Sequence, residues 1–387
     1  MKIDDPYTTG TPIRDKRMCY GREEELAYLQ DNLTRTTVRN LLVLYGQRRA
    51  GKTTLLYQLA NSPALTPHVS VLVDLQSLTY GLTPGNFFLK IAHAIYKKLR
   101  SQGLCPPSLE RAEFVGQTGV PADPQFAFDC FLDEVEPLLH ERKLILLLDE
   151  FEVLEDQMNR GKLQPEIFEY LRSLMQRREY MHFLLSGTNH IEKLTREYWS
   201  VFFNIAAHYL LPSHITQAGA EALITEPVQG SLEYDPLAVA EIRRLTADQP
   251  YLIHLVCRSL VDHCNRQQKN YATLNDVNEV LSEVMEIGKI HFHWLWERID
   301  PFAQILLLII AGGSRDEARQ FSFTEIIEIY QQQGIACSRD KLIDSLKQLL
   351  EKNVIEMDEG ANQEDVFDDA RYRVSIGLFR QWLRHRS

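Results

Sequence analysis

The sequence lacks any hydrophobic run long enough to cross a membrane, and its first residues contain no apolar signal segment. The longest strongly apolar run is Ile305–Ala311, which is far shorter than the roughly 20 residues that a membrane-spanning helix needs. A secretory leader would place such a run near the first residue. We therefore predict a cytoplasmic protein that does not associate with membranes.

The sequence also lacks paired cysteines, an excess of basic residues, internal repeats and low-complexity tracts. No C-x-x-C pair occurs, which argues against a zinc site and a disulfide framework. The formal net charge of −11 provides no global attraction to nucleic acid, so DNA binding would require a local basic patch. We predict reduced, structural thiols at all six cysteines, which are Cys19, Cys105, Cys130, Cys257, Cys264 and Cys337.

What the sequence does contain is a phosphate-binding loop between an aliphatic run and a helix-compatible segment. After residues 41–45 comes the pattern Gly46-x-x-x-x-Gly51-Lys52-Thr53. The glycines let backbone N–H groups turn inward around a polyphosphate, and the helix N-terminus adds partial positive charge. We expect Lys52 to reach the outer phosphates and Thr53 to bind Mg²⁺. The predicted ATP/ADP-binding residues are Gly46, Gln47, Arg48, Arg49, Ala50, Gly51, Lys52, Thr53 and Thr54.

A second aliphatic run, residues 143–148, ends in two carboxylates, Asp149 and Glu150. Such a run is typical of a buried parallel strand, whose carboxyl end lies at the sheet edge where phosphates bind. Asp149 is predicted to hold Mg²⁺, and Glu150 to orient and deprotonate the attacking water. A mere nucleotide-binding scaffold would not need Glu150, so we predict a slow ATPase. Glu152 and Glu155 are expected to be solvated or to face a partner.

A third buried run, residues 182–185, leads into Ser186, Gly187, Thr188 and Asn189. Ser186 and Thr188 are candidates for sensing the γ-phosphate, although such residues also form turns at strand ends. The arginine that would complete the site of a neighbouring subunit remains open among Arg172, Arg177, Arg178 and Arg196.

Strands and helices alternate through the first half of the chain, starting with a strand at Asn40–Tyr45, and this predicts an α/β fold with a parallel sheet. Short helical patterns follow from about residue 211 and predict a helical lid. The last segment reads as three helices and two strands, which is the order of a winged helix. The predicted domains are an N-terminal arm at 1–19, a P-loop ATPase core at 20–210, a lid at 211–295 and a winged helix at 296–387.

Taken in order, these motifs resemble the bacterial AAA-like ATPases of the STAND class, relatives of the origin-recognition-type AAA+ initiators. The resemblance rests on residues 21–26, 46–53, 146–151, 184–188 and 245–253 and on the C-terminal segment. It implies an ATP/ADP-switched module that closes on nucleotide and often forms oligomers. It also implies that Gly21 and Arg22 lie near the base and ribose, and that Pro250 matches the lid motif Gly-x-Pro, with Asp248 in place of its glycine.

Two functions compete on this basis. The first is a nucleotide-driven switch that forms homo-oligomers and contacts a protein partner through the lid or the winged helix. The second is a DNA-associated ATPase, such as an initiator, loader or transposition regulator. Charge favours the first, because the expected wing is acidic and repels phosphate. Its acidic residues are Glu356, Asp358, Glu359, Glu364, Asp365, Asp368 and Asp369, against a basic group of Arg371, Arg373, Arg380, Arg384, His385 and Arg386.

Overall fold

The computed structural model describes residues 2–35, 41–78, 82–116, 123–188, 206–312, 319–336, 338–358 and 370–386. The chain divides into two compact units, which are described separately. One is Pro12–Pro212, here the sheet unit, and the other combines Met1–Thr11 with Ser213–Ser387, here the helical unit. Several residues named above lie outside the described ranges: Asn40, Asn189, Arg196, Cys337, Glu359, Glu364, Asp365, Asp368 and Asp369.

The sheet unit is built on five strands that pair in parallel in the order β2-β3-β4-β1-β5. Long aliphatic runs form these strands because both faces of the sheet are covered. The α/β fold with a parallel P-loop ATPase sheet, predicted from the sequence, is confirmed. The strands are β1 (Leu41–Tyr45), β2 (Val69–Asp74), β3 (Leu144–Asp149), β4 (Met181–Gly187) and β5 (Ala207–Leu210).

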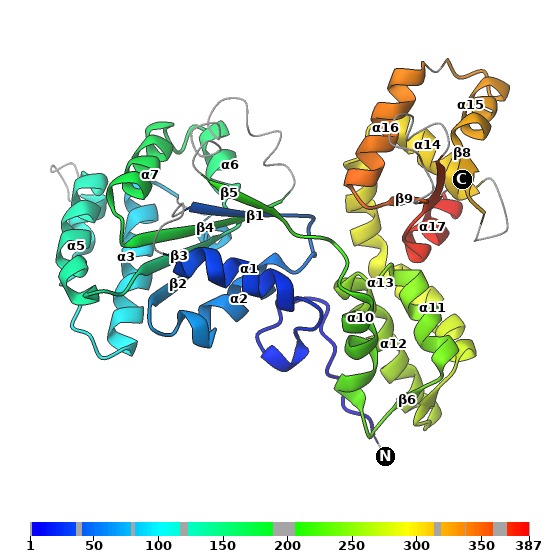
Figure 1. The fold of residues 1–387 in the computed structure, drawn as a ribbon, viewed down its shortest axis with the longest axis horizontal. Coiled ribbons are helices and arrows are strands. Elements are labelled where there is room, and N and C mark those ends of the chain that lie inside the picture. Colours follow the sequence, from blue (N-terminus) through cyan, green and yellow to red (C-terminus); the bar gives the residue numbers. More distant parts are fainter. Residues whose placement is uncertain are drawn as a thin grey trace. The chain divides into compact units, whose positions relative to one another are not determined.

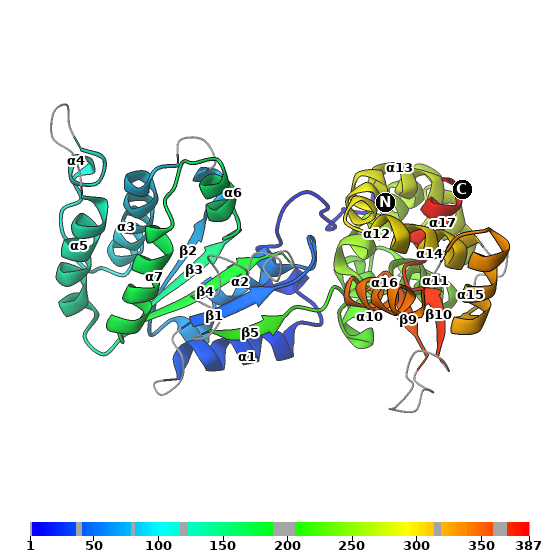
Figure 2. The same ribbon diagram turned by 90° about the horizontal axis from the view of Figure 1, so that it is seen from above.

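Helices cover both faces of this sheet (Figure 1). Side chains alternate along β1, so that Leu42 and Leu44 pack with α1 and α2, whereas Leu41 and Val43 pack in the core with α3, α5 and α7. Turned by 90°, the same arrangement shows α3 and α7 beside the strands (Figure 2). The helices are α1 (Glu23–Thr34), α2 (Lys52–Ala60), α3 (Pro84–Ser101), α4 (Arg111–Val115), α5 (Pro124–Leu139), α6 (Val153–Asn159) and α7 (Glu166–Arg177), with short 3-10 turns at Lys16–Met18, Pro63–Leu65 and Gln76–Leu78.

The helical unit begins with four helices and a small parallel pair of strands. Their starts carry clear signals: Pro236 and Pro250 occupy first-turn positions, and Thr273 forms a capping box with Asp276. The boundary drawn between residues 295 and 296 lies inside the last of these helices, which continues to Glu297. The elements are α10 (Gln217–Thr225), a 3-10 turn (Glu226–Val228), β6 (Glu233–Tyr234), α11 (Pro236–Thr246), α12 (Pro250–Gln267), β7 (Tyr271–Ala272) and α13 (Leu274–Glu297).

The C-terminal part of the helical unit contains three helices, a three-stranded antiparallel sheet in the order β8-β10-β9, and a final helix. Leu378, Phe379 and Leu383 of the final helix are buried, so that this helix closes the core of the segment. The elements are α14 (Pro301–Gly312), β8 (Phe321–Ser322), α15 (Phe323–Gln332), α16 (Arg339–Glu351), β9 (Ile355–Met357), β10 (Arg371–Val374) and α17 (Gly377–Arg384).

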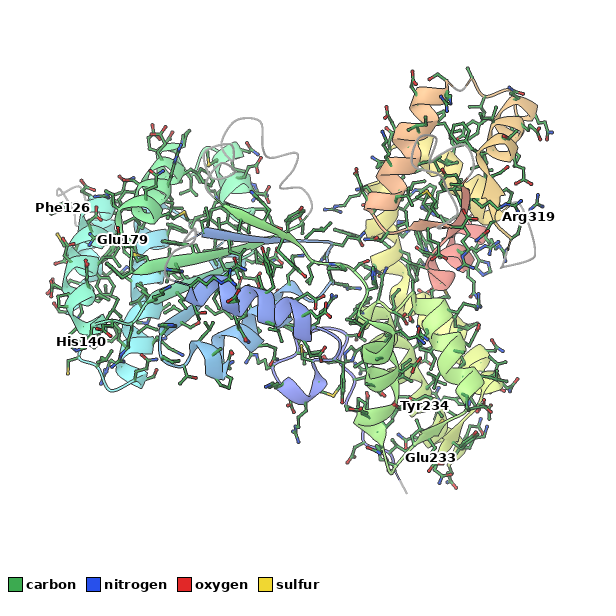
Figure 3. All side chains as sticks on the ribbon, in the orientation of Figure 1. Phe126, His140, Glu179, Glu233, Tyr234 and Arg319 are labelled. Carbon is green, nitrogen blue, oxygen red and sulfur yellow. The ribbon has the colours of Figure 1, made fainter. Side chains whose placement is uncertain are left out.

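The N-terminal segment belongs to both units in turn. Ile3 and Tyr7 are each only 3% exposed within the helical unit. The Ile3 N–H donates to Asn265 Oδ1 at 2.7 Å, and Asn265 Nδ2 donates back to Ile3 O at 2.9 Å. The Tyr7 hydroxyl donates to Ile224 O at 2.7 Å and lies beside Tyr234 of β6, which Figure 3 labels. Residues up to Thr11 therefore complete the helical unit, and the sheet unit starts at Pro12.

Two further findings bear on the expectations from composition. The described cysteines Cys19, Cys105, Cys130, Cys257 and Cys264 are free thiols. Among the helices that the structure describes, none combines the length and the apolar character that crossing a bilayer requires.

Candidate nucleotide-binding site

The loop from Gly46 to Gly51 connects the carboxyl end of β1 to the first turn of α2. Gly51 is the N-cap of α2 and has a left-handed backbone with φ of 99°. A side chain at Gly51 would meet no atom within 4 Å, so it is the backbone conformation that favours glycine there. The first turn of a helix leaves N–H groups without partners inside the helix, so the start of α2 at the end of the loop suits a phosphate anion.

Lys52 lies inside this loop. Its side chain is 7% exposed, and its Nζ donates to Gly46 O at 2.8 Å and to Gln47 O at 2.9 Å. Burial lowers the pKa of Lys52, whereas the carboxylates of Glu152, Glu150 and Asp149 act in the opposite direction. A buried ammonium group that donates to two carbonyl oxygens is well suited to pair with a phosphate.

Thr53 and Asp149 are brought together from positions 96 residues apart, because α2 begins at the sheet edge where β3 ends. The Thr53 hydroxyl donates to Asp149 Oδ2 at 2.7 Å, and Asp149 is 4% exposed. Mg²⁺ prefers oxygen ligands about 2.1 Å away in an octahedron, whose neighbouring ligands are about 3 Å apart. The hydroxyl and the carboxylate therefore fit as two ligands of one Mg²⁺ ion.

Glu150 follows the last residue of β3 and has a left-handed backbone, with φ of 55°. Such a conformation is uncommon for a residue other than glycine and is often found at functional sites. The Phe151 N–H donates to Ser186 O at 2.9 Å and fixes the chain after Glu150 to β4. Burial, followed by the negative charges of Glu152 and Asp149, raises the pKa of Glu150 to about 7, which is a value suited to a general base.

Glu152 is a site residue that the sequence interpretation missed. Of the two predictions for Glu152, that it is solvated is wrong, because its Oε1 accepts the N–H of Thr188 at 3.1 Å and its Oε2 is buried. That it faces a partner stays a prediction. Among the charges around Glu150, that of Glu152 contributes most to raising the pKa of Glu150. The signal in the sequence was the group of three acidic residues at the end of the buried strand β3, Asp149, Glu150 and Glu152. Only the first two of them have a familiar role in ATP hydrolysis.

The end of β4 contributes a buried hydroxyl and a backbone donor. Ser186 is 0% exposed, and its Oγ has no hydrogen-bond partner among the described residues. It pairs in register with Leu44 of β1, and so lies between the P-loop strand and β3. Thr188 contributes its N–H to Glu152. The sensing role of both side chains stays a prediction.

Arg22 is 4% exposed and lies beside the P-loop. Its Nη2 donates to Ala50 O at 3.1 Å and to Pro212 O at 2.8 Å, and its Nη1 pairs with Glu25 at 2.7 Å. These partners are protein groups, whereas the resemblance had suggested the base and ribose. Gly21, immediately before it, has φ of 63°, so that the chain turns there to bring Arg22 inward.

Two more segments of the sheet unit border the P-loop. The Leu211 N–H donates to Tyr45 O at 2.7 Å, and a Cβ on Gly46 would lie 2.7 Å from Leu211 O; only glycine permits this approach. The Ile13 N–H donates to the Thr54 hydroxyl at 3.2 Å. The chain segments at residues 13 and 211, near the two ends of the sheet unit, thus both run beside the nucleotide loop.

The arginines considered for action in a neighbouring subunit have different surroundings. Arg178 pairs with three carboxylates of α5: Asp129 at 3.3 Å, Asp133 at 2.6 Å and Glu136 at 3.3 Å. Arg177 donates to the Ser173 hydroxyl at 2.9 Å. Arg178 is therefore held by α5, and Figure 3 marks this region by Phe126, His140 and Glu179. Pro250 starts α12 in the helical unit, and its predicted role toward nucleotide stays a prediction.

A loop of this geometry, followed by a Thr–Asp pair and a half-buried glutamate, can be compared with known proteins. The family model of the AAA domain matches residues 35–195. The matched residues, which include the P-loop and the carboxylates after β3, are therefore similar to AAA domains. No curated protein sequence matches the chain.

Solved structures extend the likeness over most of the chain. A Walker-type ATPase of Pyrococcus abyssi is 16% identical, with 97% of this chain and 99% of that chain covered and a TM-score of 0.65. The ORC2 protein of Aeropyrum pernix, in ADPNP–ADP complexes, is 13% identical, with 96% and 98% covered and a TM-score of 0.49. At such identities the likeness concerns the fold alone. The match to the AAA domain model and the geometry of the loop agree: the site is that of a P-loop ATPase that binds nucleotide.

Proposed function

We propose that this AAA ATPase is a nucleotide-driven switch, which hydrolyses ATP slowly and changes conformation or self-associates according to the nucleotide it holds. In this proposal the N–H groups of the P-loop and Lys52 bind the β- and γ-phosphates of ATP. Thr53 and Asp149 hold Mg²⁺, which neutralises charge on the phosphates. Glu150 orients the attacking water and takes its proton. Ser186 and Thr188 lie at the strand end where the γ-phosphate would be sensed.

The observation that carries the switch proposal is the double contact of Arg22. One guanidinium nitrogen, Nη2, donates both to Ala50 O in the P-loop and to Pro212 O, at the last residue of the sheet unit. Leu211, one residue earlier, packs against Gly46 at the start of the P-loop. A movement of the P-loop on nucleotide exchange would therefore displace the chain segment that leaves for the helical unit. Hydrogen bonds to a charged group are worth about 1.5–3 kcal/mol each, so this coupling is strong enough to bias two states.

We expect Arg22→Ala to bind ATP but to lose the difference between nucleotide states, because Ala50 O and Pro212 O no longer share a donor. The measurement is particle size by small-angle scattering and light scattering, with ADP and with a non-hydrolysable ATP analogue. The wild type should differ between the two nucleotides, and the variant should not. Arg17→Ala is the matched control, since Arg17 is exposed and pairs with Asp15 at the surface.

Two outcomes would contradict this reasoning. If the wild type has the same particle size and shape with both nucleotides, the switch function is wrong. If Arg22→Ala responds to nucleotide as the wild type does, the switch does not act through Arg22. Thermal unfolding of the variant, measured in parallel, shows whether loss of the buried guanidinium has simply destabilised the sheet unit.

The alternative function, action on duplex DNA, has a feature in its favour, since α14 to β10 have the element order of a winged helix. Four of the six basic side chains that would contact phosphate are nevertheless buried or paired within the protein, whereas Arg371 and His385 are exposed. Arg380 is 4% exposed, Arg373 pairs with Glu356, and Arg384 Nε donates to Ala311 O at 3.0 Å. The Arg386 guanidinium lies 4.5 Å from the centre of the Trp382 ring. A winged helix whose arginines are buried or paired within the protein is better suited to bind a protein partner than to bind DNA.

We therefore expect duplex DNA to bind no more tightly than roughly 10⁻⁵ M at physiological salt, the ordinary non-specific range. Fluorescence anisotropy with a labelled duplex, with and without ATP, measures this. Nucleotide should leave the affinity unchanged, and the salt dependence should be shallow, because each phosphate contact adds about 0.9 to the slope. Sub-micromolar, ATP-dependent binding with a steep slope would instead establish the DNA-associated function.

A further inference from the structure

The N-terminal segment makes a second connection between the sheet unit and the helical unit. Besides the passage at residues 212–213, the chain crosses from one unit to the other at residues 11–12. On both sides of this second crossing, the backbone is held by side chains of the unit to which it belongs. We call residues 3–14, which contain the crossing and both of its anchored sides, the N-terminal strap.

The first half of the strap is bound by α12 of the helical unit. The side chain of Asn265 holds the backbone of Ile3 by two hydrogen bonds, at 2.7 and 2.9 Å. Three turns earlier on the same helix, His254 Nδ1 accepts the Thr8 N–H at 3.3 Å, and the His254 ring lies edge-on to that of Tyr7, with 5.7 Å between the ring centres. Ile3 and Tyr7 are buried, so this half of the strap is part of the core of the helical unit.

The second half of the strap is bound by α2, the helix that follows the P-loop. The Thr54 hydroxyl accepts the Ile13 N–H at 3.2 Å. One helical turn later, Gln58, which is 8% exposed, donates through Nε2 to Ile13 O and to Arg14 O, both at 3.3 Å. Thr54 directly follows Thr53, the candidate Mg²⁺ ligand. This half of the strap is therefore attached to the helix turn that borders the nucleotide site.

A short exposed segment, residues 9–12, joins these two sets of contacts. The five residue steps from Thr8 to Ile13 span at most about 18 Å, even when the chain is fully extended. Gly10 is exposed, and a Cβ there would meet no atom within 4 Å. A segment this short, anchored at both ends, transmits a displacement of one anchor to the other once it is extended.

We propose that the N-terminal strap couples the P-loop helix to the helical unit, so that a movement of α2 on nucleotide exchange changes how firmly α12 holds residues 3–8. This coupling rests on the proposed switch function, and it adds a path that is separate from the contacts of Arg22. Linkage then requires the docking of the strap to depend on the nucleotide that is bound.

The test lengthens the strap and leaves its anchoring residues in place. About eight glycine and serine residues, inserted after Gly10, add roughly 16 Å to the average span. The matched control carries the same residues ahead of Lys2, where they do not change the length of the strap. Hydrogen exchange of residues 3–8 measures the docking of the strap, and small-angle scattering measures the particle shape. Both are recorded with ADP and with a non-hydrolysable ATP analogue.

In the wild type and in the control, the exchange protection of residues 3–8 should differ by at least about fivefold between the two nucleotides, which is the lower end of typical allosteric coupling. In the insertion variant the protection should be the same with both nucleotides, and the change of particle shape should be smaller. An insertion variant that fails to fold would be replaced by Gln58→Leu. This substitution frees Ile13 O and Arg14 O from α2, and it should reduce both differences in the same way.

Two results would overturn the coupling through the strap. One is wild-type protein that changes shape between the nucleotides while the protection of residues 3–8 stays the same. The other is an insertion variant that keeps both nucleotide differences of the wild type. In either case the switch function stands without the strap. Wild-type particles of equal shape with both nucleotides would instead contradict the switch function itself, and the strap proposal with it.

Discussion

Replacing Glu150 with glutamine is expected to lower ATP hydrolysis by about 100- to 10,000-fold, the range typical of general acid–base catalysis, while ATP still binds. Glutamine has nearly the same shape, so the left-handed turn after β3 and the bond from Phe151 to Ser186 should persist. Its amide cannot accept the proton of the attacking water. Because the lost interaction forms only in the transition state, the rate should fall without a matching loss of affinity. Single-turnover hydrolysis and calorimetry with ATP and Mg²⁺ measure the two quantities.

The same two measurements can contradict the role of Glu150 as the general base. Wild-type turnover by Glu150→Gln would mean that another group takes the proton, and Glu152 would be the first carboxyl to examine. A loss of ATP affinity equal to the loss of rate would instead mean that Glu150 serves binding. Asp156→Asn controls for the removal of one negative charge from this part of the sheet unit, since Asp156 is exposed.

Replacing Lys52 with alanine is expected to reduce ATP affinity by at least about 100-fold, because charge-assisted contacts to both outer phosphates are lost at about 1.5–3 kcal/mol each. The fold should survive, since Lys52 lies at the first position of α2, where alanine is well tolerated. Calorimetry with ATP and Mg²⁺ tests the affinity, and circular dichroism tests the fold. Lys97→Ala is the control, because Lys97 is an exposed cation of α3.

Affinity like that of the wild type in Lys52→Ala would contradict the role of the P-loop. A variant that fails to fold would be followed by Lys52→Met, which keeps most of the aliphatic length of the side chain and still lacks the charge. The contacts of Lys52 Nζ with Gly46 O and Gln47 O are the ones that a phosphate would have to replace or join. Both Lys52→Ala and Lys52→Met lose these two contacts, so the two variants test the same interaction.

The sequence allowed the sheet and the centre of the site to be predicted, because local pattern determines both. The runs around Val43, Leu147 and Leu184 are aliphatic on both faces, which only a covered parallel strand requires. Parallel strands bring their carboxyl ends to one edge, so Thr53 and Asp149 had to meet although they are far apart in the chain. Neither inference depends on the exact direction of a side chain.

The contacts of Arg22 and Glu152 could not be predicted, because local sequence pattern does not determine them. Each depends on a partner that is distant in sequence and is a backbone group, namely Pro212 O and the Thr188 N–H. Backbone groups carry no signal in the sequence. The expectation for Arg22 therefore came from the family resemblance, and that for Glu152 from its charge.

The docking of Ile3 and Tyr7 on the helical unit has a consequence for the order in which the protein folds. Ile3 and its partner Asn265 are 262 residues apart, and at about 5–20 residues per second a ribosome needs on the order of 10–50 s to reach that partner. All five strands of the sheet unit are made before α12 begins. During synthesis the ATPase sheet can therefore form while residues 3–8 still wait, unpaired, for the helices that they complete.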